Sequence, residues 1–278
     1  MLNKCIILLN ILIAFTVQAQ EIKFFGEAKP AAVVIGSGEN ISKVFLDGKA
    51  LQIDKQGVFV FGFDHDAKGA HKLKVQFKNK KVKTYKYDLE AREYSKQKLH
   101  IAKKFVNPPK RELKRINSET KQMSAARTKV GKDTHAYFMS GFRYPVDSVV
   151  IREVFGDKRI LNGQPKNIHN GVDFAASLGD SIRAIADGIV RIADNNFFYN
   201  GTFIMLDHGQ GLTSVYLHMS KLIAADGQKV KKGQVIGLAG ATGRATGPHL
   251  HLGVQWYKKR IDPLNLLSIK IGEEEQNR

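Results

Sequence analysis

Residues 246–254 read TGPHLHLGV and place two histidines, His249 and His251, one residue apart. The stretch is short, β-compatible and bounded by Gly247 and Pro248, so we predict a β-strand. Side chains at positions i and i+2 of a strand lie on the same face. Both imidazoles are therefore expected to face one space, an arrangement that is useful only if something binds there.

Further residues with metal-ligand chemistry lie in the same half of the chain. NIHNGVDFAA at 167–176 places His169 four residues before Asp173, and His208 and His218 stand between this motif and HLH. Imidazole nitrogen and carboxylate oxygen both suit zinc. Each motif alone is weak, because such spacings arise by chance. Together, however, they bring five of the nine histidines into one region.

That region predicts strands joined by glycine turns. SIRAIADGIVRIAD, GTFIMLDHGQGLTSVYLHMS and KVKKGQVIGLAGATG all have β-rich composition and frequent glycine. Helical periodicity is scarce, so we expect a mostly β, antiparallel domain over residues 136–267. No repeat with a period of 20–50 residues is visible, which argues against solenoids and propellers.

Residues 21–90 also predict short strands, at the spacing of a small β-sandwich. In KLKVQFK at 72–78 the residues Leu73, Val75 and Phe77 alternate with polar residues, mostly lysine, so they are expected to face the core. KNKK at 78–81 suits a hairpin turn. No catalytic motif is visible in this segment.

Between the two β-rich segments, PP at 108–109 precedes a very basic, helix-prone stretch. We expect a mostly solvated linker helix between two separate cores. The predicted organisation is a signal peptide (1–19), an N-terminal β accessory domain (20–107), a basic helical linker (108–135), a C-terminal β domain that contains the histidine motifs (136–267) and a tail (268–278).

The N-terminus predicts export. Lys4 is followed by an apolar run and then by Val17-Gln18-Ala19, so we expect cleavage after Ala19. The alternative is an uncleaved membrane anchor, although the run is short for a bilayer span, and no stable membrane insertion is expected. Cys5, the one cysteine, lies in this segment, so the exported chain can form neither a disulfide nor a cysteine zinc site.

The chain carries a formal net charge of +18, or +17 without the expected signal peptide, which contains Lys4 and no acid. This charge favours an anionic partner. Nucleic acid is not expected, because the chain is predicted to be exported and shows no nucleic-acid-binding module. A cell-wall polymer or an anionic membrane surface fits better, and a merely solubilising surface is the alternative.

From about residue 140 to 267 the sequence resembles the M23 zinc metallopeptidases of peptidoglycan, the lysostaphin-like endopeptidases. The resemblance rests on HNGVDFAASLGDSIRAIADGIV, DHGQGLTSVYLHMS, VKKGQVIGLAGATGRATGPHLHLGV and IDPLNLL, which occur in the family's order. It implies a lysostaphin-like fold with one Zn²⁺ per chain, held by His169, Asp173 and His251. His218 and His249 would then transfer protons or stabilise the oxyanion, in an order that stays open.

The resemblance also bears on residues around the cleft. Tyr199 falls where the family has an aromatic residue that could donate to the oxyanion, although a core or rim position is an equal alternative. Asn167 and Arg159 are candidates for the groove, and His208 for a structural role. After HLH the family often has an aromatic residue and an acid, whereas Leu252 and Gly253 stand here.

We therefore expect an exported zinc metalloendopeptidase that hydrolyses peptide cross-links of peptidoglycan. The alternative is a non-catalytic M23-like module that binds the wall or activates an amidase. Such modules lack some of the five site residues, and all five are present here. No wall-targeting domain follows IDPLNLL, so we expect the Gram-negative periplasm. The bond cleaved, the partner proteins and the role of residues 20–107 stay open.

Overall fold

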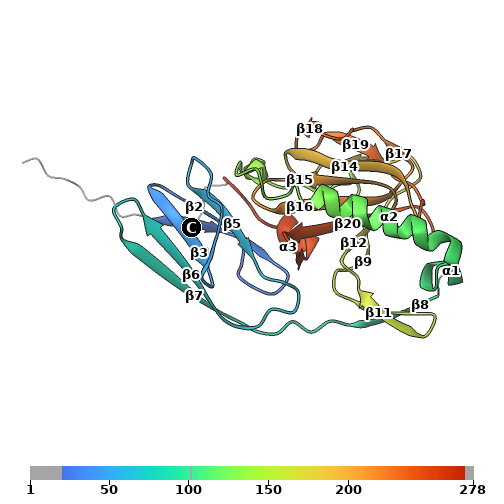
Figure 1. Cartoon of the computed structure of the whole chain (residues 1–278), viewed down its shortest axis with the longest axis horizontal. Helices are drawn as coiled ribbons and strands as arrows, with labels where there is room; N and C mark the ends of the chain where they lie inside the picture. Colours follow the sequence, from blue (N-terminus) through green and yellow to red (C-terminus); the bar gives the residue numbers. More distant parts are fainter. Residues whose placement is uncertain (1–20, 101, 273–278) are drawn as a thin grey trace, which may run out of the picture.

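The computed structural model describes residues 21–100 and 102–272 and consists of two β-rich parts lying side by side (Figure 1). The expected signal peptide lies outside the described residues, as do residues 273–278 of the expected tail. The predicted mostly β, antiparallel architecture is confirmed, with one parallel pair of strands as the exception.

The first part, which we call the front sandwich, packs two antiparallel sheets of order β1-β2-β5 and β4-β3-β6-β7 against each other. The predicted alternation is confirmed, because Leu73, Val75 and Phe77 are buried while Lys72 and Lys74 are exposed. The strands are β1 (Ile22–Phe25), β2 (Val33–Gly38), β3 (Ile41–Leu46), β4 (Lys49–Ala50), β5 (Val58–Gly62), β6 (Gly69–Phe77) and β7 (Val82–Leu89).

The second part is built on an eight-stranded antiparallel sheet, the main sheet, of order β18-β14-β15-β16-β20-β12-β9, with β21 paired to β20. Its strands are β9 (Ile151–Glu153), β12 (Gly171–Ala175), β14 (Gly188–Phe197), β15 (Gly201–Asp207), β16 (Leu212–Met219), β18 (Lys229–Val230), β20 (His249–Trp256) and β21 (Lys259–Ile261). A small antiparallel sheet of β13 (Ser181–Arg183), β19 (Val235–Leu238) and β17 (Lys221–Leu222) flanks it.

A second small sheet joins the segment after the front sandwich to the second part. In it β8 (Lys96–Leu99) runs parallel to β10 (Lys158–Leu161), which forms a hairpin with β11 (Gln164–Ile168). Since β11 ends one residue before His169, a strand from the segment 20–107 supports the hairpin that leads into the candidate metal site. The division of the chain at residues 107 and 135 therefore stays a proposal.

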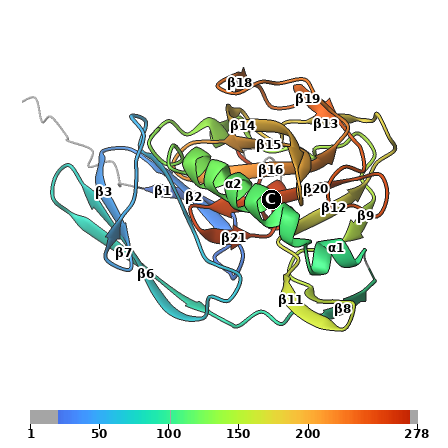
Figure 2. The same ribbon diagram turned by 45° about the vertical axis from the view of Figure 1, so that its right-hand side comes forward.

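Helix α2 (Lys110–Arg127) begins directly after Pro109 and is mostly exposed, as predicted, but one side of it packs against the main sheet. It lies across the main sheet, as both views show (Figures 1 and 2). Met123 and Ala126 pack against Phe203 and Met205 of β15. The short helices are α1 (Lys103–Val106), the 3-10 helix η1 (Tyr137–Ser140) and α3 (Pro263–Leu267). Among the helices of the described chain, none combines the length and the apolar character that crossing a membrane requires.

The two parts do not have the separate cores that the sequence suggested. One continuous apolar cluster contains Phe61 and Leu73 of the front sandwich together with Phe174 and Leu250 of the main sheet. Gln210 joins the parts with polar contacts as well. Its buried side chain accepts a hydrogen bond from Val60 N at 3.1 Å and donates to the carbonyls of Val58 and Thr134, both at 3.0 Å.

Replacing Gln210 by alanine should destabilise the protein, because the buried Val60 N–H would lose its hydrogen-bond partner away from water. We expect the free energy of unfolding to fall by about 1–3 kcal/mol, the usual cost of one unsatisfied buried group. Urea denaturation measures this. Gln122→Ala, on the exposed face of α2, is the control and should change stability by less than about 0.5 kcal/mol. Equal midpoints for both variants would contradict the role of Gln210.

Candidate functional site

The candidate site lies on one face of the paired strands β12 and β20. Their antiparallel register sets Asp173 opposite His251 and Ala175 opposite His249. Leu250 and Leu252 alternate with the histidines and are fully buried on the other face. The sequence-based prediction that both histidines of HLH share one face therefore agrees with the register.

Three side chains converge at this place. His251 Nδ1 lies 2.7 Å from Asp173 Oδ1 and 3.0 Å from His169 Nε2, and His169 Nε2 lies 3.2 Å from Asp173 Oδ1. All three residues are buried. They form a group that could hold a metal ion.

The chemistry of this donor set fits a cation. The Nδ1 of His169 faces the carbonyl of Val154 at 2.8 Å and must donate to it, since a carbonyl only accepts. In the neutral ring Nε2 then carries a lone pair, and that lone pair faces the Asp173 carboxylate. Two acceptors at this separation repel each other unless a proton or a metal ion lies between them. Two imidazole nitrogens and a carboxylate oxygen also form a known set of catalytic zinc ligands.

The electrostatic surroundings keep Asp173 ionised. Burial opposes its charge, but the hydrogen bonds and charges of His169 and His251 outweigh that effect and hold the pKa of Asp173 well below its usual range. Asp173 Oδ2, the oxygen that does not face the other two candidate ligands, lies 3.7 Å from Arg159 Nη2 and 3.9 Å from His249 Nε2. Arg159, a candidate groove residue, thus contacts the site, and it also pairs with Glu153.

A second pair of histidines lies beside the first group. The rings of His218 and His249 have their centroids 4.9 Å apart. Each Nδ1 faces a backbone carbonyl at 2.8 Å, that of Thr242 for His218 and that of Gly247 for His249. Each Nδ1 therefore donates, which leaves Nε2 with a lone pair in the neutral ring. Burial, together with the charges that His251 and His249 can carry, lowers the pKa of His218 to about 3, so this ring is neutral at pH 7.

His218 occupies an unusual backbone conformation at the end of β16. Its φ is 65°, a left-handed value that few residues other than glycine adopt. Its N–H donates to the Asn200 carbonyl at 3.1 Å. Asn200 belongs to the turn between β14 and β15. This turn is tied to the loop between β19 and β20, because Thr202 N donates to Thr242 Oγ1 at 2.9 Å. Gly201 is required here, since a Cβ would lie 2.2 Å from that Oγ1.

Sequence reasoning missed Glu119, which supports this turn from α2. Its buried carboxylate accepts from Phe198 N at 2.9 and 3.0 Å and pairs with Arg115 at 2.8 Å. The turn that it holds carries Asn200, the partner of His218. The Arg115–Glu119 spacing of i, i+4 was a visible signal of a helical pair, but it does not reveal the Phe198 contact.

Three other residues that the sequence analysis singled out lie in different surroundings. Tyr199 is half-buried on the same turn, with the Arg244 guanidinium carbon 5.2 Å from its ring centroid. His208 is fully buried between the Asp187 carbonyl and Ser214 Oγ, both at 2.7 Å, which agrees with a structural role. The side chain of Asn167 lies outside the described part of the chain.

The part of the chain that contains the candidate site is similar to known peptidases. The model of peptidase family M23 matches residues 167–263. The peptidoglycan DD-endopeptidase ShyA of Vibrio cholerae is 44% identical over 111 residues, which cover 39% of this chain and 26% of ShyA. An uncharacterized metalloprotease of Haemophilus influenzae is 42% identical over 98 residues, covering 35% of this chain and 21% of the relative. The chain thus spans about a quarter of the length of these curated relatives.

One solved structure resembles more of the molecule. The crystal structure of a candidate M23 peptidase from Pseudomonas aeruginosa covers 87% of this chain and 95% of its own, with 28% identity and a TM-score of 0.62. The match to the family model includes His169, Asp173, His218, His249 and His251, the five residues that the geometry brings together. Residues 167–263 are therefore similar to peptidase family M23.

Proposed function

We propose that this protein is an exported zinc metalloendopeptidase that hydrolyses peptide cross-links in bacterial peptidoglycan. One observation carries the proposal: His169 Nε2, Asp173 Oδ1 and His251 Nδ1 converge within 3.2 Å beside two further histidines. Three ligand side chains with neighbouring proton-transfer groups are typical of a catalytic metal site rather than a closed structural one. The relatives that carry the word peptidoglycan in their names support the substrate.

In this proposal His169, Asp173 and His251 hold one Zn²⁺. A zinc ion supplies Lewis acidity, which polarises a peptide carbonyl and makes water a stronger acid. Two neutral imidazoles and one carboxylate compensate only one of its two charges, so the site stays cationic. Arg159 holds the outer oxygen of Asp173 and thereby helps to keep Oδ1 turned toward the two ligand histidines.

His218 and His249 transfer protons in the proposed reaction. Their Nδ1 atoms donate to the carbonyls of Thr242 and Gly247, which fixes the rings and keeps Nε2 as the basic atom. One ring takes a proton from the attacking water, and one returns a proton to the leaving amine or donates to the oxyanion. Tyr199 is proposed as an additional donor at the oxyanion. The order in which the two histidines act is open to kinetic tests.

The proposed location is the periplasm of a Gram-negative cell. An exported enzyme meets peptidoglycan there, and the net charge of +17 that remains without the expected signal peptide favours a polymer whose peptides carry carboxylates. The competing proposal is an M23-like module that binds the wall without cleaving it. No observation on the five site residues favours that alternative, since all five are present.

The two histidines of β20 should respond differently to alanine substitution. His251→Ala removes a proposed ligand and should lose most of the zinc. His249→Ala is the matched control on the same strand face and should keep about one zinc per chain. Elemental analysis of both purified variants measures this. Equal zinc contents in the two variants would overturn the ligand assignment.

Peptidoglycan cleavage should require both the metal ion and His249. Purified sacculi digested with the protein should release peptide fragments whose cross-links are hydrolysed, as identified by mass spectrometry. A chelator should abolish release, and added zinc should restore it. His249→Ala should lower the rate by roughly 10²–10⁴-fold, the usual contribution of a general acid–base group. A zinc-loaded protein that binds sacculi but releases nothing would support the non-catalytic alternative.

A further inference from the structure

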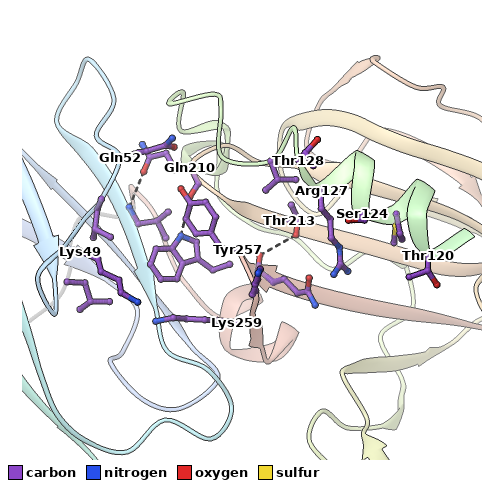
Figure 3. A pocket seen from close by; sticks show the side chains of 18 of the residues that line it. Lys49, Gln52, Thr120, Ser124, Arg127, Thr128, Gln210, Thr213, Tyr257 and Lys259 are labelled. Carbon is purple, nitrogen blue, oxygen red and sulfur yellow. Dashed lines mark hydrogen bonds between the residues drawn. The ribbon is translucent and has the colours of Figure 1, made fainter. Parts of the chain in front are cut away.

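A large cavity lies where α2, the main sheet and the front sandwich meet (Figure 3). Its volume is about 1120 Å³, slightly above the ~300–1,000 Å³ that small-molecule sites occupy. Arg127 of α2, Thr213 of β16 and Tyr257 of the β20–β21 turn line it, and Lys49 and Gln52 line it from the front sandwich. Within the described residues, none of the five candidate site residues is part of its wall.

The cavity nevertheless opens on the face of the main sheet that carries the candidate metal site. Gln255 lies on the same face of β20 as His251, four residues further along, which corresponds to ~14 Å in a strand. Thr213 is the cross-strand partner of Gln255. Tyr199 and Asn200, on the turn that contacts His218, line the cavity as well. An extended chain of about four residues could therefore reach from the site into the cavity.

The charges on the wall are unbalanced. Its two acids are already engaged: Asp47 accepts from His71 at 2.7 Å, and Glu119 accepts from Phe198 N and pairs with Arg115. Three wall cations, in contrast, have side chains with no hydrogen bond or ion pair to any residue that the structure describes: Lys49, Arg127 and Lys258. Such an excess of free donors favours an anionic ligand, and the fork of an arginine suits a carboxylate.

The rest of the wall is largely apolar. Leu51 of the front sandwich, Ile116 and Met123 of α2, and Phe197 of β14 all line the cavity. A free inorganic anion would gain nothing from these aliphatic and aromatic surfaces. A peptide with alkyl side chains and carboxylates would match both the apolar wall and the cations.

We propose that this cavity binds a carboxylate-bearing stem peptide of peptidoglycan, as an arm of the substrate that extends from the bond being cleaved. The inference rests on the proposed function, because it assumes a peptidoglycan substrate at the metal site. Arg127 binds a carboxylate of the peptide, and Lys49 adds positive charge from the front sandwich. The front sandwich and α2 thereby contribute to substrate recognition, although the proton-transfer residues lie in the region similar to peptidase family M23.

Trp256, the one tryptophan of the chain, lines the cavity and provides a direct optical signal. The probe is a purified stem tetrapeptide, titrated into the zinc-loaded His249→Ala protein so that binding is measured without turnover. We expect a saturable change in tryptophan fluorescence. The same peptide with its carboxylates converted to amides should bind at least about tenfold more weakly, the effect of losing a charged hydrogen bond.

Substitutions in the His249→Ala background locate the contact. Arg127→Met should weaken binding of the tetrapeptide about tenfold and abolish the preference over the amidated peptide, and Arg127→Lys should recover part of the affinity. Arg111→Met is the matched control, because Arg111 lies on the same helix outside the cavity and is exposed. Unchanged urea midpoints verify that each variant is folded.

Two results would overturn the inference. In one, Arg127→Met and Arg111→Met bind the tetrapeptide equally well. In the other, the fluorescence responds to a fatty acid such as decanoate and not to the tetrapeptide, which would make the cavity a lipid site. Either result can coexist with full cleavage of sacculi by the unsubstituted protein, so failure of this inference is distinguishable from failure of the proposed peptidase activity.

Discussion

The pairing of β12 with β20 is the constraint on which the site depends. Its register sets Asp173 beside His251 on one face, while Phe174 opposite Leu250 and Val172 opposite Leu252 fill the core on the other. Because side chains alternate along a strand, a slip of one residue would bury the histidines and expose the leucines. The apolar residues of the HLHL stretch therefore specify the register, and the metal-ligand geometry follows from the packing of the core.

The second half of the site depends on the turn between β14 and β15. His218 holds a left-handed φ that costs free energy unless its surroundings maintain it. The carbonyls of Asn200 and Thr242 maintain it by accepting from its backbone and its ring. Glu119 secures the same turn from α2 through Phe198 N. A helix from outside the matched M23 region thus supports a proposed proton-transfer residue, so the basic segment is more than a connector.

Much of this arrangement was predictable from local sequence patterns. Alternation identified the buried face of β6 and the common face of His249 and His251, and the resemblance to M23 peptidases supplied the set of five residues. Contacts between distant segments were not predictable. Glu119 meets Phe198 across 79 positions and Gln210 meets Val60 across 150. The charged composition of α2 correctly indicated a mostly exposed helix, but it did not reveal the small apolar patch around Ala126 that packs against the main sheet.

The four histidines of the site differ in how their tautomers are set, and this separates their roles. For His169, His218 and His249 the Nδ1 proton is committed to a main-chain carbonyl, so Nε2 is the free atom of each neutral ring. The three acceptors are main-chain carbonyls of Val154, Thr242 and Gly247, in the loops that flank β9 and β20, so these tautomers are set by the backbone and do not require a bound ligand. His251 is different, because its Nδ1 faces Asp173 and His169 instead of a carbonyl. Backbone geometry therefore aims one free nitrogen of His169 at the carboxylate, and leaves the free nitrogens of His218 and His249 as the proposed bases beside it.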